Sequence, residues 1–134
     1  MGLTHTRFRG PVGIEHDNQS TAREMARIVR QASKDEVLSA IMRKAQWRVK
    51  PLRGYLAINY RNTNPLVGRT RPARFIASKT GFNDAAGYCL AAVAEFPQLG
   101  PVTLVLLGSK SKAWRVRDAQ AILEWVAKHG RALL

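Results

Sequence analysis

Hydrophobic and polar positions in residues 1–45 predict a loop followed by two helices. Residues 1–20 are rich in turn formers and polar side chains, a composition typical of a loop. From Thr21 the apolar positions recur at helical spacing, and Thr21 and Glu24 have the spacing of a capping box. The predicted inward face of this helix comprises Ala22, Met25, Ala26, Val29 and Ala32. The opposite stripe comprises Arg23, Arg27 and Arg30, which we interpret as a solvated helix face.

A second, shorter helix is predicted to begin near Asp35. Its inward positions would be Val37, Leu38, Ile41 and Met42. The apolar positions of residues 46–60 are interrupted by Pro51 and Gly54, which favours two short strands joined by a turn. Residues 61–65 break this pattern before the next strand.

Three longer runs predict a sheet. Residues 74–78 form a strand that leads into Lys79-Thr80-Gly81, and residues 87–96 and 102–108 form two more. The connection at residues 97–101 is too short for a crossover helix. We therefore expect the three strands to form an antiparallel meander.

The last predicted element is a helix over residues 115–129, which should pack on the sheet. Its apolar positions are Ala119, Ile122, Leu123 and Val126, and Gly130 supplies the stop. Helices followed by a meander and one closing helix indicate the α+β class. We expect a single domain over residues 1–134, divided into a loop with helices (1–45), a strand pair with a loop (46–72), the meander (73–109) and the last helix (113–130).

Charge adds a property that the periodicity does not show. The 134 residues include 22 Lys and Arg against 9 Asp and Glu, a formal net charge of +13. Such a chain associates with polyanions, and nucleic acid, acidic lipid surfaces and anionic cell-wall polymers all satisfy that requirement. Nucleic acid is disfavoured because no recognised binding motif occurs and no aromatic residue interleaves the arginine stripe.

Several kinds of site are not indicated by the sequence. Cys89 is the single cysteine, and its apolar surroundings favour a small buried hydrophobe. His5, His16 and His129 show no metal-ligand spacing, and no phosphate-binding glycine loop occurs, so we expect neither a metal nor a cofactor. No apolar run is long enough to span a membrane, and the amino terminus lacks the apolar stretch of a signal peptide.

Lys79-Thr80-Gly81 is the motif that carries chemistry. Lys-Thr-Gly is one of three short motifs of serine β-lactamases and penicillin-binding proteins, together with Ser-x-x-Lys and Ser-x-Asn. Residues 75–90, Phe-Ile-Ala-Ser-Lys-Thr-Gly-Phe-Asn-Asp-Ala-Ala-Gly-Tyr-Cys-Leu, resemble the motif region of low-molecular-mass D-alanyl-D-alanine carboxypeptidases and endopeptidases. Residues 8–26, 62–66, 102–108 and 117–125 also resemble that family, so the resemblance runs in order along almost the whole chain.

The resemblance implies a fold and a set of roles. The fold would be part of the β-lactamase and penicillin-binding transpeptidase type, whose five-stranded sheet takes two strands from the amino-terminal portion. Lys79 would supply positive charge to the cleft, and Thr80 would donate its hydroxyl to the carboxylate of the substrate. Gly81 would let the ligand approach the backbone, and the N–H of Phe82 would form half of an oxyanion hole. A competing interpretation is that Lys79 only protects an edge strand from aggregation.

The chain departs from the family pattern in its nucleophile. Ser109 and Lys112 have Ser-x-x-Lys spacing, but they follow the motif and leave a predicted strand, whereas the chemistry needs a helix start. Residues 62–64, Asn-Thr-Asn, imitate Ser-x-Asn only loosely. We therefore predict that this chain has no catalytic residue and is inactive alone, with the edge of the motif strand and one apolar helix face exposed.

The leading hypothesis is the carboxy-terminal part of a serine-type D-Ala-D-Ala carboxypeptidase or endopeptidase. The intact enzyme would bind peptidoglycan stem peptides and β-lactams and would act outside the cytoplasmic membrane. The alternatives are a non-catalytic remnant that binds the cell wall or a protein partner through its cationic surface and open sheet edge, and a basic nucleic-acid-binding protein.

Overall fold

The computed structural model describes residues 1–13, 15 and 17–133. Two helices come first, α1 (Ala22–Ala32) and α2 (Glu36–Met42), and a strand pair follows, β1 (Gln46–Val49) and β2 (Ile58–Arg61). Then come β3 (Arg74–Asn83), β4 (Gly87–Phe96) and β5 (Gly100–Ser109). The long helix α3 (Lys112–His129) continues into a 3-10 turn, Gly130–Leu133. The order of predicted helices and strands is confirmed.

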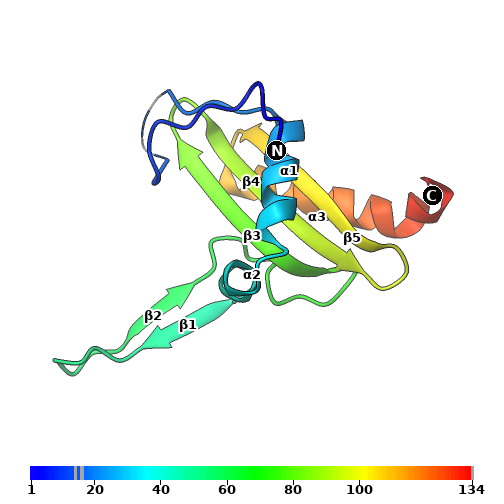
Figure 1. Ribbon diagram of the computed structural model, residues 1–134. Coiled ribbons are helices and arrows are strands. Elements are labelled where there is room, and N and C mark those ends of the chain that lie inside the picture. The colour runs from blue at the N-terminus through cyan, green and yellow to red at the C-terminus, as the bar shows by residue number, and fades with distance from the viewer. Residues whose placement is uncertain (14, 16, 134) are drawn as a thin grey trace.

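The main sheet has three antiparallel strands in the order β3-β4-β5, so the predicted meander is confirmed. Among the described residues, β3 and β5 are therefore the two edge strands. Helices α1 and α2 lie on one face of the sheet and α3 lies on the other (Figure 1). Each face of the sheet is thus covered by helix while both edges stay open.

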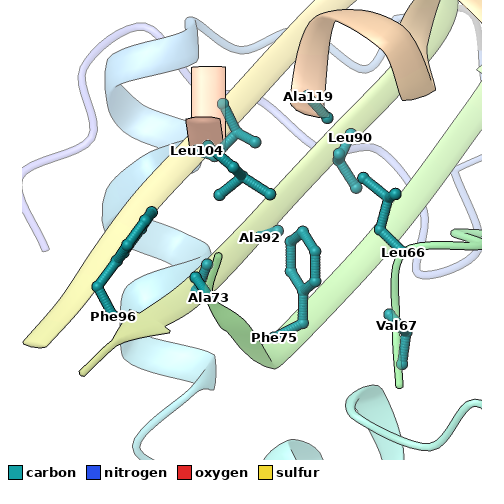
Figure 2. Packing of buried hydrophobic residues seen from close by; sticks show 11 residues of the cluster. Leu66, Val67, Ala73, Phe75, Leu90, Ala92, Phe96, Leu104 and Ala119 are labelled. Atoms are coloured by element: carbon teal, nitrogen blue, oxygen red, sulfur yellow. The ribbon is translucent and has the colours of Figure 1, made fainter. Parts of the chain in front are cut away.

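The hydrophobic core lies in two layers because both faces of the sheet are apolar. The larger layer joins the sheet to α3 and to the loop before β3, and Figure 2 shows Leu66, Phe75 and Leu90 turned toward one another near Ala119 of α3. The smaller layer joins Ala77, Ala91 and Val93 of the sheet to Val29 of α1. Both layers of the core therefore support β3, which carries the Lys-Thr-Gly segment, and its neighbour β4.

The start of α1 follows the sequence prediction only in part. Thr21 caps the helix, its hydroxyl accepting from the N–H of Glu24 at 3.2 Å. The Glu24 carboxylate does not return to Thr21 and instead accepts from Thr4, His5 and Thr6 of the amino-terminal segment. The reciprocal capping box was therefore wrong, because three donors of a distant segment hold the carboxylate. The predicted solvated stripe of Arg23, Arg27 and Arg30 is confirmed.

Helix α2 has its predicted cap, since Asp35 accepts from the N–H of Leu38 at 2.9 Å. Its predicted inward face is wrong: Val37, Leu38 and Ile41 are exposed, and only Met42 packs against the core. The helix is seven residues long and docks on β3 with its small residues, and the Ser39 hydroxyl donates to the carbonyl of Ile76. Periodicity located the apolar stripe, but the docking of so short a helix placed that stripe outward.

The carboxy-terminal elements give three further corrections. Helix α3 begins at Lys112, capped by Ser111, and buries Ala119 and Leu123, but Ile122 is exposed. Gly130 does end the helix but has ordinary helical dihedrals. A Cβ there would approach Leu99 Cδ1 to 2.4 Å, so close packing explains this glycine better than a left-handed cap.

Cys89 is half-buried, at a β-bulge between Tyr88 and Leu90. The predicted burial of this residue is only partial, because the bulge turns it away from the regular pleat. Ser109 is the last residue of β5, paired with Tyr88, and not a loop residue.

Candidate functional site

The Lys-Thr-Gly segment lies in the second half of β3, on an edge of the sheet. Lys79, Thr80, Gly81 and Phe82 pair with Ala91, Leu90, Cys89 and Tyr88 of β4. Because β3 has no second neighbour among the described residues, its outer backbone groups are open to an added strand. Alternation along the strand places Lys79 on the face that α1 covers, and Thr80 and Phe82 on the face of α3.

Thr80 meets a second hydroxyl from outside the sheet. Its Oγ1 shares a hydrogen bond of 2.5 Å with Oγ1 of Thr63, in the loop before β3. Thr80 is half-buried, and Thr63 is exposed. The loop thus holds the Thr80 side chain in one orientation at the edge of the sheet.

That loop is itself fixed by two asparagines. Asn64 is buried, and its Nδ2 donates to the Ser78 hydroxyl at 2.9 Å while its Oδ1 accepts from the N–H of Leu66 at 3.1 Å. Asn62 donates to the carbonyl of Lys44 at 3.0 Å, at the base of the β1–β2 pair. Since buried polar groups are costly when unpaired, these bonds determine where Thr63 lies.

Arg115 of α3 reaches the same region from behind the sheet. It is only 3% exposed, and its guanidinium donates to the carbonyls of Thr63 and Cys89, each at 3.3 Å. Its Cζ also lies 5.9 Å from the centre of the Tyr88 ring. A cation held by two carbonyls thus ties helix, sheet and loop together.

Gly81 and Phe82 form the open end of the segment. A Cβ on Gly81 would meet Cys89 Cβ at 3.8 Å, an ordinary contact, so packing within the described chain does not require glycine there. Phe82 is 57% exposed and stacks on Tyr88 with ring centroids 4.2 Å apart. The Lys79 ammonium is exposed and donates to the carbonyl of Thr80. The segment therefore presents a cation on one face of the sheet, a hydroxyl on the other face and an open backbone along its edge.

No nucleophile with a neighbouring base is found on this segment. Ser109 ends β5 and Lys112 begins α3, so the Ser-x-x-Lys spacing here spans a strand end and a turn. His5 lies beside Glu24, and His129 stacks on Trp125 at the end of α3. His16 lies outside the described residues. Within the described ranges no cluster of three or more metal-ligating side chains is found, and no helix is long and apolar enough to cross a membrane.

The sequence profile of the D-alanyl-D-alanine carboxypeptidase family matches residues 1–111. The chain belongs to this family. Two curated relatives are the D-alanyl-D-alanine endopeptidases of Pseudomonas aeruginosa, 29% identical over 132 residues, and of Escherichia coli, 28% identical over 126 residues. Each match covers 94% of this chain but 40% of the relative, so the chain spans less than half the length of these family members.

Solved structures agree with this family on the fold of the chain. A cysteine-to-alanine variant of a Streptomyces DD-transpeptidase aligns with a TM-score of 0.79 at 27% identity, covering 92% of this chain and 48% of that one. A serine-to-alanine variant of the same enzyme gives 0.78 with the same identity and coverage. The architecture is therefore part of the penicillin-binding and β-lactamase-like fold, as the family resemblance implies.

Two residues of the site carried no role in the sequence prediction. Thr63 lies in a stretch that the resemblance places before the motif strand and that imitates Ser-x-Asn only loosely, and nothing local indicates that it meets Thr80. Arg115 could have been found by spacing, since it lies four residues before Ala119 and so falls on the apolar stripe of the last helix. An arginine on a core-facing stripe must find buried partners, which is a recognisable signal.

Proposed function

We propose that this chain supplies the substrate-binding strand of a serine-type D-Ala-D-Ala carboxypeptidase or endopeptidase acting on peptidoglycan stem peptides. The main support is the position of Lys79-Thr80-Gly81 on an open edge of the sheet. A peptide can add to such an edge by main-chain hydrogen bonds while its terminal group meets the side chains of the strand. The intact enzyme would act outside the cytoplasmic membrane, where that substrate lies.

The proposed roles follow from the atoms available on β3. The Thr80 hydroxyl donates to the carboxylate of the terminal D-alanine, and the Lys79 ammonium attracts that carboxylate into the site. The missing side chain of Gly81 lets the peptide lie against the strand, and the N–H of Phe82 forms half of an oxyanion hole. Thr63 and Arg115 are positioning residues, because Thr63 contacts the Thr80 hydroxyl and Arg115 holds the carbonyls of Thr63 and of Cys89 on β4.

The attacking group is not proposed for this chain. Acyl transfer requires a serine activated by a neighbouring lysine, and the only Ser-x-x-Lys spacing, Ser109 to Lys112, lies where a strand ends. The relatives are more than twice as long as the matched segment, and we propose that their unmatched part carries the nucleophile. Alone, this chain would bind the peptide end without cleaving it.

Labelling with a fluorescent penicillin tests the absence of a nucleophile. A penicillin acylates a competent serine and gives an adduct that survives heating in detergent. We expect no fluorescent band from this chain and a strong one from a full-length family member run beside it. A heat-stable adduct on this chain, mapped to any serine, would refute the proposed division of roles.

Peptide binding tests the role of Thr80. A peptide ending in D-Ala-D-Ala should shift the amide resonances of residues 79–83, and one ending in L-Ala-L-Ala should not. Thr80→Val should weaken binding about tenfold or more, the usual loss for a hydrogen bond to a charged group. Thr63→Val is the matched control, because it removes the same internal hydrogen bond but keeps the Thr80 hydroxyl. Because Thr63 also orients Thr80, Thr63→Val should weaken binding less than Thr80→Val does. Equal losses would assign the whole effect to the internal hydrogen bond and contradict a direct contact between Thr80 and the ligand.

A further inference from the structure

The β1–β2 hairpin stands apart from the rest of the molecule. It projects away from the sheet and helices (Figure 1), and all residues of both strands are exposed. Its base is anchored where the N–H of Asn62 donates to the carbonyl of Ala45 at 2.8 Å. Two-stranded hairpins are marginally stable by themselves, so a projecting hairpin rich in apolar residues indicates a surface that meets something else.

The hairpin has two chemically different faces. The strands pair Trp47 with Tyr60 and Val49 with Ile58, and paired residues lie on the same side of a sheet. One face is therefore two aromatic and two β-branched side chains, each between 37% and 57% exposed. The intervening pairs, Gln46 with Arg61 and Arg48 with Asn59, make the opposite face polar and cationic.

The tip of the hairpin extends the apolar surface. Leu52 and Tyr55 are fully exposed and Leu56 is 84% exposed, three large apolar side chains in five residues. Nothing in the described chain shields them. A tip of this kind is suited to insertion into an apolar phase, since the transfer of two leucine side chains out of water is favourable.

The net charge of the hairpin indicates which kind of partner binds to it. Residues 44–61 contain five cations and no Asp or Glu, namely Lys44, Arg48, Lys50, Arg53 and Arg61. The Lys44 ammonium lies 3.6 Å from the centre of the Trp47 ring, so cation and aromatic surface occupy one patch. An anionic polymer would bind the lysines and arginines but would leave the tip leucines in water. An anionic lipid surface binds the cations through its headgroups and buries the leucines in its apolar interior.

We propose that the β1–β2 hairpin is a peripheral membrane anchor that docks on anionic phospholipid. The tip leucines and Tyr55 enter the boundary between headgroups and acyl chains, and Trp47 and Tyr60 lie at headgroup level, where such rings are enriched. The flanking lysines and arginines contact lipid phosphates. This assignment is independent of the substrate-binding strand and can hold or fail without it.

Vesicle sedimentation tests the anchor. The whole chain should pellet with vesicles of mixed phosphatidylcholine and phosphatidylglycerol and remain in solution with phosphatidylcholine alone. The double variant Leu52→Ser with Leu56→Ser should lower the partition coefficient by at least about tenfold. The control, Val37→Ser with Ile41→Ser, changes two exposed apolar residues of α2, 70% and 61% exposed, and should stay within about twofold of the wild type.

Tryptophan fluorescence gives a second measurement that does not depend on variants of the tip. With Trp114→Phe and Trp125→Phe, Trp47 is the one remaining tryptophan of three, and its emission should shift to the blue on adding the anionic vesicles. Three results would each overturn the proposal. These are failure of the wild-type chain to bind the anionic vesicles, binding of the tip variant as strong as that of the wild type, and a loss of binding in the α2 control as large as that in the tip variant. If the tip variant binds as well as the wild type and added salt abolishes the binding of both, the interaction is a simple attraction to polyanions.

Discussion

Glu24 shows how one side chain can serve a different purpose from the one its spacing predicts. Its carboxylate is buried at the start of α1 and accepts from the backbone of Thr4 and His5 and from the Thr6 hydroxyl. The Thr6 hydroxyl contributes most to lowering the pKa of Glu24; burial opposes it, and the bonds from His5 and Thr4 add to it. The amino-terminal segment is thus attached to α1 through an ionised carboxylate.

A pH dependence of stability follows from this lowered pKa. The folded state binds the Glu24 proton less readily than the unfolded state does. The stabilisation is therefore complete above the ordinary pKa of a glutamate and is lost as the pH falls through the lower pKa of the folded state. Glu24→Gln should reduce the free energy of unfolding at neutral pH and flatten its decline in acid. Urea unfolding across that range measures this, with the exposed Glu36→Gln as the control. Parallel acid profiles for wild type and Glu24→Gln would contradict it.

At the scale of elements, the pattern of the long strand β4 predicts both its limits and its burial, whereas the pattern of the short helix α2 predicts only its position and cap. The strand β4 has the predicted limits because its apolar run is continuous and both of its faces are buried. The seven-residue α2 has the predicted cap but the opposite orientation, because a few contacts with β3 decide how it docks. Which residues of an element are buried therefore depends on the neighbouring elements that it packs against. Periodicity alone predicts only that one side of the helix is apolar.

The two faces of the sheet make a prediction about β4 and β5. Leu90 is 2% exposed in the layer beneath α3, so Leu90→Ala should leave a cavity and lower the free energy of unfolding by about 2–5 kcal/mol. Leu107 on β5 is 46% exposed, and Leu107→Ala should change it by less than about 1 kcal/mol. Urea denaturation of both variants provides the comparison. Equal losses would mean that an additional surface covers Leu107.

For the molecule as a whole, the open edges of the sheet matter most. The edge at β3 carries the proposed substrate segment, and the edge at β5 leaves a ten-residue strand with one neighbour among the described elements. The family members are longer than this chain, and the resemblance implies that their sheet has five strands. Such an edge favours pairing with another chain unless a charge or a covering segment prevents it.

Self-association through β5 is the expected consequence. Sedimentation equilibrium should show concentration-dependent oligomers of the wild-type chain. Leu107→Lys adds a charge on that edge strand and should shift the population toward monomer. Val37→Lys adds the same charge to an exposed apolar position on α2 and should leave the distribution unchanged. A monomeric wild-type chain would exclude this self-association. Equal effects of the two lysine substitutions would show that the chains do not associate through β5.

The sequence by itself determined the order of elements, the antiparallel meander and the family, because long apolar runs, short connections and the Lys-Thr-Gly segment are local properties of the chain. Only the tertiary structure decided that Thr63 meets Thr80, that Arg115 joins α3 to the loop before β3, and that Glu24 holds the amino-terminal segment. These contacts link residues 17, 52 and 18 positions apart. No local pattern encodes such a pairing, since it depends on how finished elements pack and which buried polar groups must then be satisfied.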